Sequence, residues 1–184
     1  MSNEYVQPVL EKRKVSIADR IHFRLMSLVH EDLYRLFRDP YEVLKAAGVE
    51  PGQTVLEVGC GPGFFTVPAA KIVGEQGSVC ALDINPLAIE KAEQKVNTSG
   101  AANVETLLAD ASQTGLPDQS FDLIFVFGFA NPVGSMNDIL TELHRLLKPG
   151  GILAVEGRRG QPQVAGARFS LLERQGRISR FKKI

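Results

Sequence analysis

The 184-residue sequence has no long hydrophobic run and no net charge, and these absences exclude whole classes of protein. No apolar stretch approaches the roughly 18 residues that a membrane-spanning helix needs, and residues 1–14 lack the apolar centre of a signal peptide. We therefore expect a cytoplasmic protein with no membrane partner. Hydrophobic residues make up 44% and charged residues 23% of the chain, which is ordinary for one globular domain with its own core.

Residues that bind metals or form disulfides are also scarce. The two cysteines, Cys60 and Cys80, are too few for a disulfide framework, and both are expected to be small buried side chains. The three histidines have no Cys-x-x-Cys or His-Glu-x-x-His companions; they are His22, His30 and His144. The sequence therefore predicts no metal site, and it assigns the histidines to packing or to the surface.

The zero net charge conceals an asymmetry along the chain. Residues 157–184 contain eight basic residues and one acidic residue, or +7 (8 − 1), whereas the remainder contains 13 basic and 20 acidic residues, or −7. A basic segment of this kind can bind an anionic partner such as RNA. The same arginines are expected on the solvated face of a hairpin, which is the interpretation that we prefer.

A glycine-rich stretch, residues 54–66 (TVLEVGCGPGFFT), organises the rest of the chain. Its apolar, β-branched start predicts a buried parallel strand. Gly59, Gly61 and Gly63 follow at alternate positions, where glycine lets the backbone turn tightly and approach a ligand. A helical pattern opens at Phe64. A strand, a glycine loop and a helix in this order are typical of a Rossmann-type nucleotide site.

The spacing indicates which nucleotide would bind. A dinucleotide site requires Gly-x-Gly-x-x-Gly, but Phe64 occupies the position of the third glycine. Glu57 lies at the end of the strand, where a carboxylate would repel a pyrophosphate and attract an ammonium or sulfonium group. The loop therefore favours a cationic ligand over a diphosphate.

The segment 57–63 (EVGCGPG) resembles the first motif of class I S-adenosylmethionine-dependent methyltransferases. The resemblance runs from about Tyr41 to about Glu156, and it points in particular to the broad group of ubiquinone/menaquinone-biosynthesis-type enzymes. It implies an α/β fold with a doubly wound, mainly parallel sheet, S-adenosylmethionine as the cofactor, and methyl transfer as the activity.

Acids that end two later strands fit the same resemblance. Asp83 ends the strand 78–83, 24 positions after Gly59 (83 − 59), which is near the spacing at which a carboxylate meets ribose hydroxyls. The alternative is an N-cap for the helix that begins at Pro86. Asp110 lies in the strand 104–111, and the resemblance places it on the adenine amine, with a loop cap as the alternative. The expected cofactor-binding residues are Glu57, Gly59, Cys60, Gly61, Gly63, Asp83, Ile84, Asp110, Ala111 and Phe127.

The strand 121–127 is expected to end where the methyl group would lie. Phe127 and Phe129 offer aromatic faces that could attract a sulfonium by about 1 kcal/mol. Asp122 lies at the opposite end and is expected to be structural. The pair 131–132 (Asn-Pro) does not match the motif of amino-group methylases in position or in its second half. We identify no general base, because methyl transfer can rest on in-line positioning.

We expect one domain with three parts. Residues 1–48 form helices that, by the resemblance, make a partial lid; residues 49–156 form the cofactor-binding core; residues 157–184 form a basic antiparallel hairpin. Residues 157–166 contain three glycines and a proline, so the last helix of the family is missing or shortened. An apolar face left uncovered beside the strand 152–155 predicts a homodimer, unless residues 16–37 cover it.

The predicted function is methyl transfer from S-adenosylmethionine to a small-molecule acceptor that the sequence does not identify. Two alternatives stay open. One is an RNA- or protein-directed methyltransferase that uses the basic C-terminal segment. The other is a module that binds the cofactor without turnover.

Overall fold

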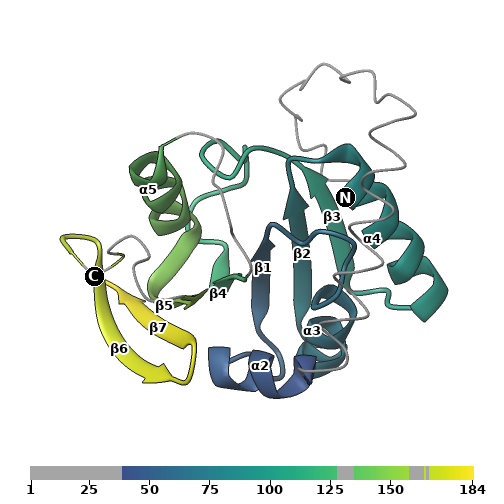
Figure 1. The fold of residues 1–184 in the computed structure, drawn as a ribbon, viewed down its shortest axis with the longest axis horizontal. Coiled ribbons are helices and arrows are strands. Elements are labelled where there is room, and N and C mark those ends of the chain that lie inside the picture. Colours follow the sequence, from purple (N-terminus) through teal and green to yellow (C-terminus); the bar gives the residue numbers. More distant parts are fainter. Residues whose placement is uncertain (1–38, 128–134, 158–163, 165) are drawn as a thin grey trace.

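The computed structural model describes residues 39–127, 135–157, 164 and 166–184. Their helices and strands form one seven-stranded sheet with helices on both faces (Figure 1). In chain order the elements are α2 (Pro40–Ala47), β1 (Thr54–Val58), α3 (Thr66–Val73), β2 (Ser78–Asp83), α4 (Pro86–Ser99), β3 (Val104–Leu108), β4 (Phe121–Val126), α5 (Met136–Leu146), β5 (Leu147–Glu156), β6 (Phe169–Gln175) and β7 (Ile178–Lys183). None of the described helices is both long enough and apolar enough to span a membrane.

The strand order across the sheet is β3-β2-β1-β4-β5-β7-β6. Strands β1 to β5 pair in parallel, whereas β7 is antiparallel to both β5 and β6. The order reverses between β1 and β4, and ligands of such sheets bind beyond the carboxyl ends of the strands at this switch point. The predicted doubly wound sheet with a C-terminal antiparallel hairpin is confirmed.

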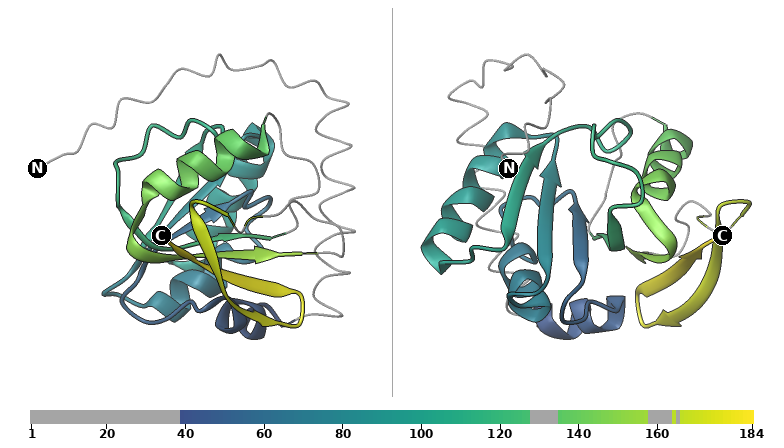
Figure 2. Two further views of the ribbon diagram at one scale, coloured as in Figure 1. Left: turned by 90° about the vertical axis from the view of Figure 1, so that its left-hand side faces the viewer. Right: turned by 180° about the vertical axis from the view of Figure 1, so that it is seen from behind.

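Both faces of the sheet are buried. Val55 and Phe125 pack in a cluster with α2 and α3, whereas Leu56 and Ile124 pack in a cluster with α5. The side view shows the strands between α5 and α2 (Figure 2). Because the central strands β1 and β4 are buried on both faces, they consist mainly of consecutive apolar residues rather than alternating ones, whereas the outer strand β3 is partly exposed.

Both ends of α2 are capped by residues that favour these positions. Asp39 caps α2 by accepting a hydrogen bond from the Tyr41 amide (2.9 Å), and Gly48 ends this helix with a φ of 88°. Helix α4 has Asn85 rather than Asp83 as its N-cap. The alternative interpretation of Asp83 as a helix cap is therefore wrong.

Two elements are shorter than expected at the edge where ligands would bind. Helix α3 begins at Thr66, later than predicted, because residues 61–65 form consecutive turns of the glycine loop. Strand β3 ends at Leu108 because Asp110 opens a turn by accepting a hydrogen bond from the Ser112 amide (2.8 Å). In both cases backbone that was predicted to be regular instead forms a loop at the carboxyl edge of the sheet.

The described residues between β5 and β6 (157, 164 and 166–168) are not helical. The apolar face of β5 is nevertheless covered, since Leu153 and Ala154 are completely buried in the two core clusters. Apolar exposure occurs instead on β6, where Leu171 is 53% exposed and Leu172 is 55% exposed. The segments 1–38 and 128–134, which include most of the predicted lid, Phe129 and the Asn-Pro pair, lie outside the described residues.

Candidate cofactor-binding site

Glu57 is buried beneath the glycine loop rather than open to solvent. Its side chain is 3% exposed, and the Thr66 hydroxyl donates a hydrogen bond of 2.5 Å to Oε2. Burial raises the pKa of Glu57 to about 8; the bond from Thr66 partly lowers this pKa, and the nearby Asp83 charge raises it again. Without a compensating cation, Glu57 is therefore largely a neutral acid at pH 7.

The glycine loop is tied to the end of the neighbouring strand. The backbone amides of Gly59 and Cys60 both donate to the Leu82 carbonyl oxygen, at 2.8 and 3.0 Å. The Cys60 thiol is buried, and burial raises its pKa, so the thiol stays protonated. Cys60 thus contributes its backbone and its small size to the loop rather than a nucleophile.

Gly61 and Gly63 have different roles in the loop. Gly61 has a φ of 53°, and a Cβ at this position would meet nothing within 4 Å, so the loop faces open space. At Gly63, a Cβ would lie 3.2 Å from the Ala92 Cα, so this glycine allows α4 to pack against the loop. The open space at Gly61 is where a ligand could approach the backbone.

Asp83 connects the end of β2 to this loop. Its Oδ2 accepts a hydrogen bond from the Gly61 amide (2.9 Å), and its Oδ1 accepts one from the Asn85 amide (2.8 Å). Burial raises the pKa of Asp83, although the bonds from Asn85 and Gly61 oppose this rise. The next residue, Ile84, is 41% exposed, so an apolar surface lies open beside the carboxylate.

Asp110 lies on the next strand outward and organises a turn. Its Oδ1 accepts hydrogen bonds from the Ser112 amide (2.8 Å) and hydroxyl (2.7 Å). The Ala109 amide donates to the Asp83 carbonyl oxygen (3.1 Å), which places this turn beside the end of β2. Ala111 is mostly buried. One oxygen of Asp110, Oδ1, therefore caps the loop, as the alternative interpretation predicted. The other oxygen, Oδ2, accepts no hydrogen bond from the described residues.

Phe127 belongs to an aromatic cluster beneath the loop. Its ring stacks on Phe125, with 4.8 Å between the ring centroids, and lies edge-on to Phe65 at 5.1 Å. Only 7% of Phe127 is exposed. Packing is thus the observed role of this residue, and its predicted contact with a cofactor stays a prediction.

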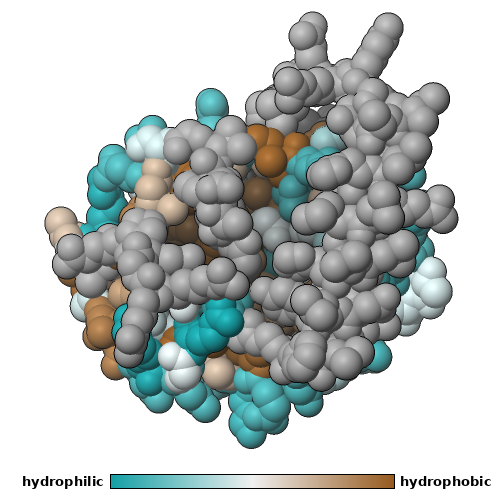
Figure 3. Space-filling view, in the orientation of Figure 1, coloured by the Kyte–Doolittle hydropathy of each residue, from teal (hydrophilic) through white to brown (hydrophobic). Residues whose placement is uncertain are grey.

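The structure brings the predicted residues to one edge of the sheet. Val58 pairs with Leu82 on one side and with Val126 on the other, so β1, β2 and β4 end at the same level. In the orientation of Figure 1, the space-filling view shows hydrophobic and hydrophilic residues side by side on the face of the molecule that it presents (Figure 3). Asp122 is at the opposite edge, bonded to the Thr54 amide (2.8 Å) and to Lys148 (2.7 Å), which supports the structural role predicted for it.

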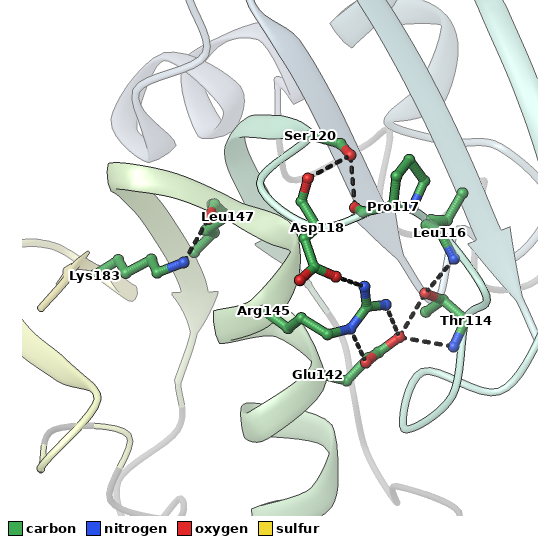
Figure 4. A network of polar contacts seen from close by, with 9 residues as sticks. All are labelled: Thr114, Leu116, Pro117, Asp118, Ser120, Glu142, Arg145, Leu147 and Lys183. Atoms are coloured by element: carbon green, nitrogen blue, oxygen red, sulfur yellow. Dashed lines mark hydrogen bonds and ion pairs between the residues drawn. The ribbon is translucent and has the colours of Figure 1, made fainter.

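Sequence reasoning missed three contributors to this edge. Among the described residues, Thr66 supplies the only hydrogen bond to the Glu57 carboxylate, and their separation of nine positions matches no spacing rule. Glu142 and Arg145, three positions apart on α5, could be recognised as a helical ion pair. Nothing in the sequence indicates that Glu142 also holds Thr114 in the loop after β3 (Figure 4).

An acid near the end of β1, three glycines in the loop after it, a second acid at the end of β2, and a reversal of strand order between β1 and β4 define a Rossmann-like methyltransferase fold. The chain belongs to the methyltransferase-domain family, which matches residues 49–173.

Curated relatives and solved structures agree with this family. A demethylmenaquinone methyltransferase from Geobacillus stearothermophilus is 37% identical over 128 residues, which is 69% of this chain and 54% of that protein. The corresponding enzyme from Listeria welshimeri is 32% identical over 164 residues, covering 89% of this chain and 66% of that protein. The chain thus spans between half and two thirds of these relatives' length. The crystal structure of a SAM-dependent methyltransferase from Aquifex aeolicus superposes with a TM-score of 0.72 at 28% identity, covering 90% of this chain and 99% of that one.

Proposed function

We propose that this domain transfers the methyl group of S-adenosylmethionine to a small-molecule acceptor. The observation that carries the proposal is the hydrogen bond from the Gly61 amide to Asp83, which joins the acid at the end of β2 to the glycine loop at the switch point of the sheet. The family and the neighbouring crystal structure support the same activity.

The open space and the acidic residues at this edge support S-adenosylmethionine as the ligand. The open space at Gly61 would admit the methionine part beside the backbone. Glu57 would supply a buried negative charge to the cationic end of the molecule, since a nearby cation favours the ionised carboxylate. Gly59, Cys60 and Gly63 would keep the loop in place.

The remaining predicted residues would hold the nucleoside. We assign Asp83 to the ribose hydroxyls, Ile84 to one face of the adenine, and Asp110 with the Ala111 backbone to its edge. The free Oδ2 of Asp110 and the exposed Ile84 side chain support these assignments. Phe127 would act on the cofactor indirectly, by packing beneath the loop.

When bound, S-adenosylmethionine supplies a methyl group on a sulfonium that is its own leaving group. The protein then has to align an acceptor in line with the sulfur–carbon bond, which by itself can lower the barrier greatly. The curated relatives are named for demethylmenaquinone. A quinone of that kind is therefore the first acceptor to test, and the acceptor of this chain remains a small molecule of undetermined structure.

The test uses the purified 184-residue protein with S-adenosylmethionine labelled in its methyl group. Label should pass to an acceptor in a cell extract or to an added demethylated quinol. The Asp83→Ala variant should bind S-adenosylhomocysteine more weakly by about 1–3 kcal/mol, because it loses a charge-assisted contact. As a matched control, Asp39→Ala removes a similar local bond to a backbone amide far from the glycine loop. Binding without any transfer would favour the cofactor-binding module, and tight NAD binding with no S-adenosyl ligand would refute the proposal.

The RNA-directed alternative receives little support from the hairpin. Arg174, Arg177 and Arg180 already contact Ser179, Glu156 and Glu173, as expected for a solvated hairpin face. An affinity for RNA that falls steeply with salt would favour this alternative, because contacts to phosphates release counterions.

We propose in addition that the domain forms a homodimer. The support for it differs from what the sequence suggested, because β5 is covered and the exposed leucines lie on β6.

A further inference from the structure

The carboxylate of Glu142 on α5 accepts four hydrogen bonds, two from its own helix and two from a distant loop. Arg145 donates to both oxygens, with Nη2 to Oε1 at 2.7 Å and Nε to Oε2 at 2.8 Å. Thr114 donates to Oε1 twice, from its amide (2.9 Å) and from its hydroxyl (2.7 Å). Burial raises the pKa of Glu142, but the bonds from Arg145 and Thr114 outweigh this effect, so the net pKa is lowered and the group is ionised at neutral pH.

This network fixes the far end of the turn that Asp110 begins. Thr114 is 2% exposed, and its hydroxyl also accepts a hydrogen bond from the Leu116 amide (3.2 Å). Arg145 also forms an ion pair with Asp118, which lies further along the same connection between β3 and β4 (Figure 4). The loop from β3 to β4 contains no helix, so these side-chain contacts take over the positioning that a packed helix would supply.

The near end of the turn carries the group assigned to adenine. Asp110 Oδ1 accepts from Ser112, and the Gln113 amide donates to the Asp110 carbonyl oxygen (3.0 Å). Only three residues separate Asp110 from Thr114, and the bonds from Ser112 and Gln113 to Asp110 keep this segment in a turn. A shift of Thr114 would therefore move Asp110 as well.

We propose that Glu142, held by Arg145, is a positioning residue for recognition of the adenine base. This inference rests on the proposed function, because it needs an S-adenosyl ligand at Asp110. Glu142 is not expected to touch the ligand. It sets where Oδ2 of Asp110 lies, and thereby how well the site distinguishes an amino group on the base from a carbonyl.

The alternative is that the network only joins the loop to α5 and stabilises the fold. The two roles predict different results for two ligands, S-adenosylhomocysteine and S-inosylhomocysteine, which differ in having an exocyclic amino group or a carbonyl oxygen at the base edge. If the role is purely structural, loss of the network should weaken the binding of both ligands equally. If the role is positioning, the loss should weaken binding of the adenosyl compound selectively, since its exocyclic amino group donates to Asp110 whereas the inosyl compound presents a carbonyl oxygen there.

The experiment measures both affinities by calorimetry for the full-length protein and for Glu142→Gln. Glutamine has the same shape but cannot accept four hydrogen bonds, because its amide group is a donor facing donors. The wild type should prefer the adenosyl ligand by about tenfold, the discrimination expected from one hydrogen bond to a charged group. In Glu142→Gln this preference should fall to about twofold or less, mainly through loss of adenosyl affinity.

Arg145→Lys provides a second variant, since lysine cannot make the paired contacts of the guanidinium, and it should lower the preference in the same direction. Asp122→Asn is the matched control. It breaks a carboxylate network of the same kind, with Lys148 and the Thr54 amide, at the opposite edge of the sheet. This control should leave the base preference unchanged. Hydrogen exchange of the Gln113 and Thr114 amides should accelerate in Glu142→Gln but not in Asp122→Asn.

A wild-type preference that persists in both Glu142→Gln and Arg145→Lys would overturn this inference while leaving the proposed function intact. Equal weakening of both ligands would overturn it in favour of the structural role. If the wild type bound neither S-adenosyl- nor S-inosylhomocysteine, the proposed function would fail first, and the inference would fail with it.

Discussion

Glu57 illustrates how one buried side chain can depend on a ligand for its charge. It is 3% exposed, and its hydrogen bond from Thr66 does not compensate for the loss of water, so its pKa rises to about 8. A sulfonium beside the loop would reverse this balance by favouring the carboxylate. The product of methyl transfer lacks the sulfonium charge, so under the proposed function Glu57 would favour binding of the methyl donor over binding of the product.

The ligand-free protein should therefore lose stability as the pH rises. Below the ordinary pKa of 4.5, Glu57 is protonated in both the folded and the unfolded chain. Between 4.5 and about 8 the unfolded chain ionises while the folded one keeps its proton, so this group lowers the free energy of unfolding by up to about 1.4 kcal/mol per pH unit. Above about pH 8 both states are ionised and the slope ends.

Urea unfolding of the wild type and Glu57→Gln at several pH values measures this effect. The difference between the two proteins isolates Glu57, because the other titrating groups are common to both. Glutamine cannot ionise, so the free energy of unfolding of the variant should rise relative to that of the wild type from about pH 5 to about pH 8. A difference that did not change with pH would show that Glu57 has an ordinary pKa.

A comparison between two glycines tests the ligand side of the loop. Gly61 and Gly52 both have a positive φ, 53° and 82°, and a Cβ at either would meet nothing within 4 Å. Gly61→Leu and Gly52→Leu should therefore cost similar stability, about 1–2 kcal/mol each for the left-handed backbone. Only Gly61→Leu should also abolish binding of S-adenosylhomocysteine, because its side chain would occupy the open space at the loop. Equal effects of the two substitutions on binding would place the ligand elsewhere.

At the scale of helices and strands, much of the fold could be predicted from the sequence, because the signals are local. Asp39-Pro40 and Gly48 mark the two ends of α2, and the apolar runs of the strands reflect burial on both faces. The sequence did not decide between neighbouring candidates for a local contact. The Leu87 amide donates to Asn85 rather than to Asp83, and the Ser112 amide donates to Asp110 where β3 was expected to continue, although both contacts span only two positions.

Some residues of the candidate site could likewise be recognised from the sequence, and others could not. Glu57, Gly61 and Asp83 could be recognised because they follow strands, and parallel strands end at one edge. The hydroxyl of Thr66 and the four-bond carboxylate of Glu142 could not, because each depends on packing across elements. The exposure expected for β5 was wrong for a related reason: the core clusters on both faces cover Leu153 and Ala154 with no helix among the described residues between β5 and β6.

Asn103 connects two elements in a way that can be tested directly. Its Nδ2 donates to the carbonyl oxygens of Ala70 (3.0 Å) and Gly74 (2.9 Å), so it holds the end of α3 against the start of β3. Asn103→Ala should lower the free energy of unfolding by about 1–3 kcal/mol, because carbonyl groups at the helix end lose their partner. Asn97→Ala, on the exposed side of α4, is the matched control and should change stability by less than about 0.5 kcal/mol. Urea denaturation measures both, and equal small effects would show that water replaces the Asn103 amide at little cost.

On the scale of the whole molecule, the basic C-terminal hairpin is less cationic at its surface than its sequence suggests. Glu173 pairs with Arg180, and Glu156 pairs with Arg177, so two of its arginines are engaged within the chain. The feature of the hairpin that stands out is apolar. Leu171 and Leu172 are each more than half exposed on β6, the last strand of the sheet.

Association between two copies would cover these leucines. Pairing of β6 with a second β6 by backbone hydrogen bonds is disfavoured, because the register shifts between Leu171 and Glu173 and a bulged, charged edge resists pairing. Contact through the side chains of the two leucines avoids this obstacle.

Covering the two leucines would contribute about 3 kcal/mol in total, so Leu171→Ser with Leu172→Ser should raise the dimer dissociation constant about 100-fold. Tyr41→Ser is the matched control, since Tyr41 is 42% exposed on α2. Light scattering across micromolar concentrations should give a dimeric mass for the wild type and the control and a monomeric mass for the leucine variant. A wild type that stays monomeric throughout would refute the dimer, and a dimer that survives loss of both leucines would place its interface on another surface, because no other large apolar side chain of β6 is exposed.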